Sequence, residues 1–139
     1  MIGSSKGGYS SIYYGFCIPN SIVIAGAPQY FLADYLNNDG TKTNLAFLLH
    51  EDFSEDNYEK LNLKLKNLIR TSPIRPNKIF LHFSNKEHTY EDHIKYMLED
   101  FKSFNVIVET DIGSYTSHSG VADAYPLYLT KILNTLKGL

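Results

Sequence analysis

The residues best placed to do chemistry open the chain. Gly3, Ser5 and Gly7 form the pattern G-x-S-x-G, which in serine enzymes places the serine on a sharp turn between a strand and a helix. The turn lifts the hydroxyl clear of the sheet, and the flanking glycines avoid a clash between a β-carbon and the neighbouring strand or helix. Chance supplies this pattern in about one chain in twenty of this length. On the motif alone, a plain glycine-serine turn into a helix therefore stays open.

Lys6 lies in the same turn and raises the alternative of a phosphate-binding loop. Such a loop needs a lysine followed directly by serine or threonine, after a longer gap from its first glycine. Here Lys6 is followed by Gly7 and Gly8, and this order disfavours phosphate binding.

Two later segments carry the partners that a nucleophilic serine needs. Glu87 comes directly after the strand-like run at 78–84, and His118 lies in the loop 110–120 after the last strand-like run. Enzymes built on such a serine turn place their triad in the order serine, acid, histidine, with the last two after later strands. We therefore expect His118 to act as general base for Ser5, and Glu87 to orient the imidazole and stabilise its charged form.

Alternatives exist for both partners. Glu91 and Asp92 lie close to Glu87, although their positions are more typical of charges at the start of a helix. Taken alone, His118 is more typical of a solvated loop histidine. Its position after the last strand favours the catalytic interpretation.

The remaining histidines and the cysteine show no pattern for a metal or a second nucleophile. His50, and His88 with His93, have acidic neighbours but lack the i, i+4 pairing of a helical zinc site. We therefore expect no metal and no cofactor. His82 lies within a strand pattern and is expected to pack in the core. Cys17 stands alone, which excludes an internal disulfide, and its mostly apolar surroundings predict a buried residue.

Hydrophobic patterning predicts the elements that must position these residues. Short β-branched runs indicate strands at 21–25, 78–84 and 105–109. Apolar residues at helical spacing indicate helices within 58–69, 94–101 and 125–136. Strands that alternate with helices predict an α/β protein, with a small, mostly parallel sheet between two helical layers.

The chain is expected to form a single domain over residues 1–139, with no internal repeat or linker. A helix should follow the serine turn and end near Gly15. Residues 26–57 are the least regular part and are interpreted as an inserted excursion that covers a pocket. Only Met1 and Ile2 precede a turn that normally leaves a buried strand, so the sequence looks like the C-terminal part of a longer protein.

Charge and hydropathy exclude several classes of partner. Thirteen basic and fifteen acidic residues, without a basic stripe, give no electrostatic footprint for nucleic acid or an anionic membrane. No signal-peptide pattern is present, and no apolar run approaches the ~20 residues that span a bilayer. A cytoplasmic location is the expectation.

Three segments together resemble the α/β-hydrolase superfamily: the serine turn at 3–8, the stretch 87–94 and the histidine loop at 118–120. Within it, the chain is most similar to the hydrolase-like proteins of bacterial capsular polysaccharide biosynthesis, with accessory-secretion acetyltransferase-like proteins as more distant relatives. The resemblance implies that Ser5 is the nucleophile and that the backbone N–H of Lys6 is one oxyanion donor. The loop that supplies the second donor in the superfamily has no counterpart in this sequence.

The expected function is serine-dependent acyl transfer on a carbohydrate-linked ester in capsule or surface-polysaccharide biosynthesis. The residues do not choose between an esterase, which transfers the acyl group to water, and an O-acyltransferase, which transfers it to a sugar hydroxyl. Tyr30 and Phe31 are expected to line a sugar site, although aromatics at this spacing also suit a core. The alternative function is a non-catalytic scaffold or binding partner with the same fold.

The part of the superfamily sheet that this sequence contains would be three adjacent strands with helices on both faces. Its inner edge, where the strand before the serine turn belongs, would be open and apolar. We therefore expect the chain to form homo-oligomers or to be only marginally stable.

Overall fold

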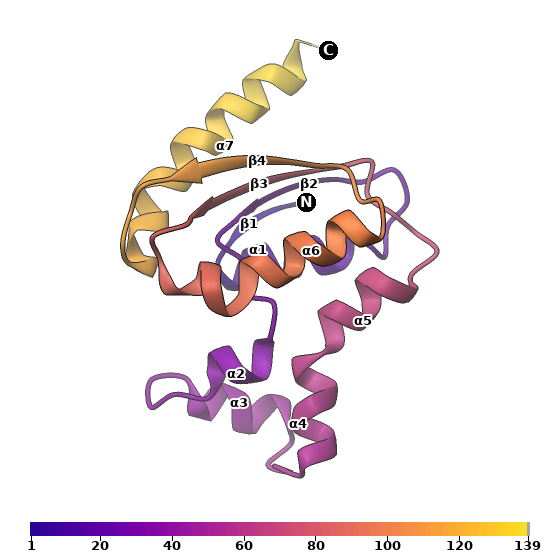
Figure 1. Ribbon diagram of the computed structural model, residues 1–139, viewed down its shortest axis with the longest axis vertical. Helices are drawn as coiled ribbons and strands as arrows, with labels where there is room; N and C mark the ends of the chain where they lie inside the picture. The colour runs from indigo at the N-terminus through magenta and orange to yellow at the C-terminus, as the bar shows by residue number, and fades with distance from the viewer. Residues whose placement is uncertain (139) are drawn as a thin grey trace.

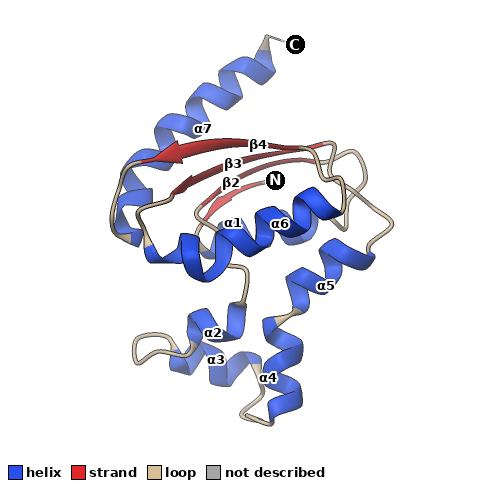
Figure 2. Ribbon diagram, viewed as in Figure 1, coloured by secondary structure: helices blue, strands red, loops and turns tan. Residues whose placement is uncertain are grey.

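The computed structural model describes residues 1–138 and has three layers (Figure 1). The middle layer is a sheet of four parallel strands in the order β1-β2-β3-β4. The strands are β1 (Ile2–Ser4), β2 (Ile22–Gly26), β3 (Lys78–Ser84) and β4 (Val108–Gly113). Parallel neighbours require crossover connections, and each connection between consecutive strands contains helix (Figure 2). The predicted α/β architecture with a small parallel sheet is therefore confirmed.

The helices fall into four groups, three between consecutive strands and one after β4. The helix α1 (Lys6–Gly15) connects β1 to β2. Four helices connect β2 to β3: α2 (Leu32–Leu36), α3 (Lys42–Leu48), α4 (Glu55–Asn62) and α5 (Lys64–Thr71). A π-helical turn η1 (Tyr90–Ile94) leads into α6 (Lys95–Ser103), and a 3₁₀ turn η2 (His118–Gly120) leads into α7 (Val121–Lys137). None of the helices described in residues 1–138 is both long and apolar enough to cross a membrane.

Alternate residues of the central strands belong to two separate hydrophobic cores, because successive side chains of a strand point to opposite faces of the sheet. On one face, Val23 and Leu81 pack with α1 and α6, whose Ile12 and Phe101 are fully buried. On the other face, α7 covers the sheet (Figure 1). The side chains that meet there come from β2, β3 and α7: Ile24, Phe80, Tyr125, Tyr128 and Ile132. Helices on both faces explain why β2 and β3 read as continuous apolar runs.

The strand before the serine turn exists, although it is only three residues long. Gly3 pairs with Ala25, and Ser4 pairs with Gly26. The Tyr125 hydroxyl of α7 holds this strand in place, because it accepts from the Gly3 N–H at 3.2 Å and donates to the Ile24 carbonyl at 2.7 Å. The sheet therefore has four strands, and the expectation of three is corrected.

The last strand begins at Val108, three residues later than predicted. The first residues of the predicted run 105–109 form the C-terminal cap of α6 instead. Asn105 adopts a left-handed backbone conformation with φ 55°, and the Val106 N–H returns to the Phe101 carbonyl at 2.8 Å. This is the pattern of a Schellman-type helix end. Pairing with β3 then continues to Gly113.

Two further expectations change. The excursion at 26–57 contains α2, α3 and the start of α4, which enclose a small core of their own around Ala33, Leu36, Leu45 and Leu49. Cys17 is exposed rather than buried. Its neighbour Phe16, just after the end of α1, takes the buried place against Phe101.

Candidate active site

Ser5 stands between the end of β1 and the start of α1 in a backbone conformation that side chains rarely adopt, with φ 52° and ψ −122°. Two hydrogen bonds hold the turn. The Ser5 N–H donates to the Gly26 carbonyl at 2.7 Å, and the Ser5 carbonyl accepts from the Tyr9 N–H at 3.0 Å. Strained residues of this kind persist only where the surroundings enforce them, and they cluster at functional sites. The predicted strand-turn-helix setting of the serine is present.

The glycines around Ser5 differ in what they permit. A β-carbon on Gly3 would lie 2.3 Å from the Gly7 carbonyl oxygen, and one on Gly8 would lie 3.0 Å from the Gly26 carbonyl oxygen. A β-carbon on Gly7 would meet no described atom within 4 Å. The expectation that Gly3 and Gly7 are both required is thus correct for Gly3 and wrong for Gly7, and Gly8 is the second tightly packed position.

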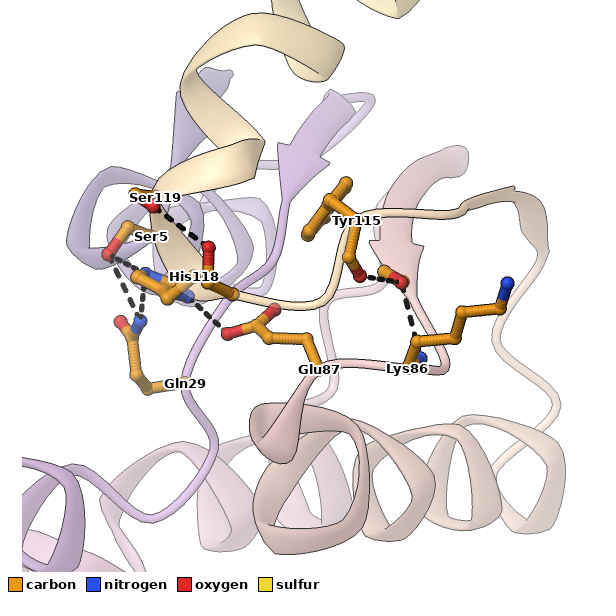
Figure 3. A network of polar contacts seen from close by, with 9 residues as sticks. Ser5, Gln29, Lys86, Glu87, Tyr115, His118 and Ser119 are labelled. Carbon is orange, nitrogen blue, oxygen red and sulfur yellow. Dashed lines mark hydrogen bonds and ion pairs between the residues drawn. The ribbon is translucent and has the colours of Figure 1, made fainter.

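The structure brings Ser5, His118 and Glu87 into one chain of contacts (Figure 3). The His118 Nε2 lies 2.8 Å from the Ser5 Oγ, and the His118 Nδ1 lies 2.7 Å from the Glu87 Oε1. These are hydrogen-bond distances of the kind that connect a nucleophile, its base and the group that orients the base. Residues 113 positions apart in the sequence are therefore neighbours in the fold.

Glu87 is the carboxylate that contacts His118, and its alternatives lie elsewhere. Its side chain is buried, with 2% of the residue exposed. Burial acts to raise the pKa of the Glu87 carboxyl, but its interactions with His118, Thr89 and His88 together outweigh burial, so the pKa is lowered from its usual value. Glu91 and Asp92 are exposed, and Glu91 pairs with Lys95 on its own helical segment at 2.5 Å.

One buried hydroxyl joins the two loops that carry the acid and the histidine. The Ser84 side chain, at the end of β3, donates to the Tyr115 carbonyl at 2.5 Å and accepts from the Lys86 N–H at 3.2 Å. Tyr115 belongs to the loop that leads to His118, and Lys86 directly precedes Glu87. The Ser84 hydroxyl therefore sets the spacing between the histidine and its carboxylate.

Gln29 is a site residue that the sequence did not reveal. It is fully buried, and its Nε2 lies 3.1 Å from the Ser5 Oγ and 3.5 Å from the His118 Nε2. The sequence does hold one indication of this role, because Gln29 lies three residues after the end of β2. In open α/β folds, binding and catalytic sites form at the carboxyl ends of the strands. The interpretation of residues 26–57 as an irregular excursion hid this signal.

Two clefts adjoin at Tyr35 and Thr41, and the smaller of them is lined by Ser5. The smaller, of about 480 Å³, begins at Ser5 and Lys6 and continues between apolar side chains, including Leu36 and Phe47. The larger, of about 800 Å³, is lined by aromatic, acidic and polar residues: Phe31, Asp34, Tyr35, Asn38, Thr41, His88, Glu91, Asp92, His93 and Tyr96. The Tyr35 ring stands between the two, with its centroid 5.9 Å from that of His118 and 5.8 Å from that of His93.

The two aromatic residues predicted to line a sugar site have different positions. Phe31 lines the larger cleft. Tyr30 is fully buried, its hydroxyl donates to the Asp100 carboxylate, and it lines neither of the two clefts beside Ser5. The expectation for Tyr30 is therefore corrected, because its side chain anchors the segment after β2 to α6 and does not line a sugar site.

His82 packs in the core as expected, with its ring against Tyr115, Tyr125 and Tyr128. Its Nδ1 lies 2.6 Å from the Asp111 carboxylate. Within residues 1–138, no three His, Cys, Asp or Glu side chains are grouped so that they could hold a metal ion.

A parallel sheet covered on both faces, with a serine turn after β1, a carboxylate after β3 and a histidine after β4, is the C-terminal portion of an α/β-hydrolase fold. No family model and no curated protein sequence matches the chain.

Solved structures confirm the fold. The capsule O-acetyltransferase of Neisseria meningitidis serogroup A superposes with a TM-score of 0.80 at 25% identity, over 96% of this chain and 55% of that chain. Esterase B from Lactobacillus rhamnosis gives a TM-score of 0.63 at 15% identity, over 99% of this chain and 50% of that chain. The S-formylglutathione hydrolase from Staphylococcus aureus gives a TM-score of 0.60 at 16% identity, over 98% of this chain and 52% of that chain. The chain thus spans about half the length of each of these enzymes.

Proposed function

We propose that this chain carries the catalytic serine, acid and histidine of an acyl-transfer enzyme whose substrate or product is a carbohydrate ester. The observation that carries the proposal is the contact chain from Ser5 through His118 to Glu87, with distances of 2.8 and 2.7 Å. The strained backbone at Ser5 supports it, because strain of this kind is retained where it serves a site.

The proposed reaction has two halves. In the first, the Ser5 Oγ bonds to the acyl carbon while its proton passes to the His118 Nε2, and the leaving group departs with that proton. In the second, His118 takes a proton from the incoming hydroxyl, whose oxygen attacks the acyl carbon, and the Ser5 Oγ leaves and regains a proton. Glu87 keeps the imidazole in the tautomer that accepts at Nε2 and stabilises the imidazolium.

The N–H of Lys6 is the proposed oxyanion donor, as the residue after the nucleophile. Lys6 is the first residue of α1, and the first N–H groups of a helix have no acceptor within it. They also lie at the positive end of the helix dipole, which stabilises the negative charge of a tetrahedral intermediate.

A sugar hydroxyl is the proposed acceptor, because the larger cleft suits a carbohydrate. The faces of Phe31, Tyr35 and Tyr96 can pack against the C–H surfaces of a sugar ring, and the carboxylates of Asp34 and Asp92 can accept from its hydroxyls. This cleft reaches His118 through Tyr35. The capsule O-acetyltransferase with the same fold supports the choice of a surface polysaccharide, and its solved complex with CoA suggests an acyl-CoA as the donor.

The proposal is tested by labelling with a fluorophosphonate probe, which reacts with activated serines. We expect the chain to be labelled, Ser5→Ala to lose the label, and Ser10→Ala to keep it, because Ser10 lines the same cleft but its hydroxyl bonds to the Lys6 carbonyl. An unlabelled chain that is folded, or equal labelling of Ser5→Ala, would favour the non-catalytic scaffold instead.

A further inference from the structure

Gln29 contacts the two atoms between which the proton moves in the proposed reaction. Its Nε2 lies 3.1 Å from the Ser5 Oγ and 3.5 Å from the His118 Nε2, and these two atoms are themselves 2.8 Å apart (Figure 3). The amide nitrogen, the hydroxyl and the imidazole nitrogen therefore form a compact triangle inside the site.

The contacts of His118 decide which end of the Gln29 amide faces this triangle. In the neutral imidazole that acts as a base, the His118 Nδ1–H donates to the Glu87 carboxylate, and the Nε2 without a proton accepts the Ser5 O–H. A carbonyl oxygen beside these two atoms would meet acceptors only. The NH₂ group of Gln29 must therefore face them, and it donates to a lone pair of the Ser5 Oγ.

The other end of the amide shows that this contact fixes its orientation. The Gln29 Oε1 is buried and has no hydrogen-bond partner among the described residues. The Gln29 side chain makes its hydrogen bond at the end that points at the serine.

The backbone around Gln29 is held on both sides. Before it, the Ala27 N–H donates to the His82 carbonyl at 2.7 Å. After it, the Phe31 N–H donates to the His93 Nδ1 at 3.1 Å, and Tyr30 is anchored to Asp100. The amide is therefore presented from a fixed segment, as a catalytic group requires.

We propose that Gln29 is a further catalytic residue, a hydrogen-bond donor to the Ser5 Oγ in both halves of the reaction. This rests on the proposed acyl-transfer function. As His118 withdraws the proton, negative charge grows on the Oγ, and a donor to an ionised oxygen forms a stronger bond than a donor to a neutral one. The same bond assists when the Oγ leaves the acyl-enzyme. Because the interaction strengthens toward the transition state, it accelerates the reaction rather than only binding.

The test is the rate at which the fluorophosphonate probe labels Ser5 in Gln29→Met, which keeps the length of the side chain and removes the donor. We expect labelling to slow by about 10- to 100-fold, with an unchanged or higher melting temperature, because the change removes an unpaired buried carbonyl. Asn134→Leu is the control, since Asn134 is exposed on α7 and lines neither of the two clefts near the site.

A second variant changes the pH dependence of labelling, which would stay the same if Gln29 served only to pack the core. In Gln29→Glu, a carboxylate near the His118 Nε2 favours the imidazolium over the neutral ring. Because labelling needs the neutral imidazole, the acidic limb of the pH-rate profile should move to higher pH.

The two proposals fail in different ways. Labelling of Gln29→Met at the rate of the unaltered chain, with no shift of the profile in Gln29→Glu, would overturn the role of Gln29 and leave Ser5 as the nucleophile. A folded, unaltered chain that is not labelled would overturn both.

Discussion

Gly3 and Gly7 flank Ser5 symmetrically in the sequence, yet only Gly3 faces a close neighbour. Replacing Gly3 with alanine forces its β-carbon against the backbone of α1, so we expect a loss of about 1–3 kcal/mol in the free energy of unfolding, together with slower labelling of Ser5. Replacing Gly7 with alanine fills open space in a helix, so we expect a gain of roughly 0.5–1 kcal/mol and normal labelling. Thermal melts and labelling rates check the pair. Equal effects of the two substitutions would contradict the packing described for the turn.

Glu87 should leave a signature in the pH dependence of stability. The pKa of its carboxyl is lower in the folded chain than its usual value, so the unfolded chain binds a proton first as the pH falls. The stabilisation is fully present above the usual carboxyl range and is lost as the pH falls through the lowered pKa. We expect the melting temperature of Glu87→Gln to change less between pH 6 and pH 3, roughly the range of carboxyl titration, than that of the unaltered chain. An equal change would mean that Glu87 is not held ionised by His118. Glu91→Gln, on the exposed surface, is the matched control and should behave like the unaltered chain.

At the scale of elements, the loops after β3 and β4 must arrive at one place, and the Ser84 hydroxyl joins them. Ser84→Ala removes the donor to the Tyr115 carbonyl and leaves buried backbone groups unpaired, so we expect a loss of about 1–3 kcal/mol in the free energy of unfolding. Labelling of Ser5 should slow as well, because the spacing of His118 and Glu87 loosens. Ser103→Ala is the control, since its hydroxyl bonds to a carbonyl on the exposed side of α6. Stability and labelling that match the control would show that other contacts hold the two loops.

The sequence predicted the elements with strong periodicity and the triad candidates, because Glu87 and His118 follow strands that are visible in the pattern and Ser5 belongs to a recognisable motif. It did not predict the exact last strand, since the helix end at Asn105 and Val106 depends on a backbone conformation. Nor could it separate Tyr30 from Phe31, because adjacent residues in a loop point in directions that only the tertiary structure decides. Gln29 was missed for a related reason: its contacts come from residues 24 and 89 positions away.

At the scale of the whole molecule, the two edges of the sheet differ. The outer strand β4 carries Glu109 and Asp111, and charges of this kind discourage pairing with another chain. The strand β1 at the other edge carries no charged side chain, and Ile2 is 53% exposed. Among the described residues it pairs only with β2.

This open edge predicts that the 139-residue chain associates with itself. We expect light scattering to show dimers or larger species whose mass rises with concentration. Ile2→Lys should shift the sample toward monomer, whereas Leu127→Lys, at an exposed position of α7, should not. A monomer at every concentration would contradict this expectation.

The central claim is that Ser5 attacks an acyl group with the help of His118. The most direct measurement is mass spectrometry of the chain quenched during reaction with p-nitrophenyl acetate or acetyl-CoA, followed by mapping of the acetylated peptide. We predict one acetyl group, located on Ser5, that is absent from Ser5→Ala and strongly reduced in His118→Ala. A folded chain that takes up no acetyl group, or takes it up equally when Ser5 is replaced, would contradict the account.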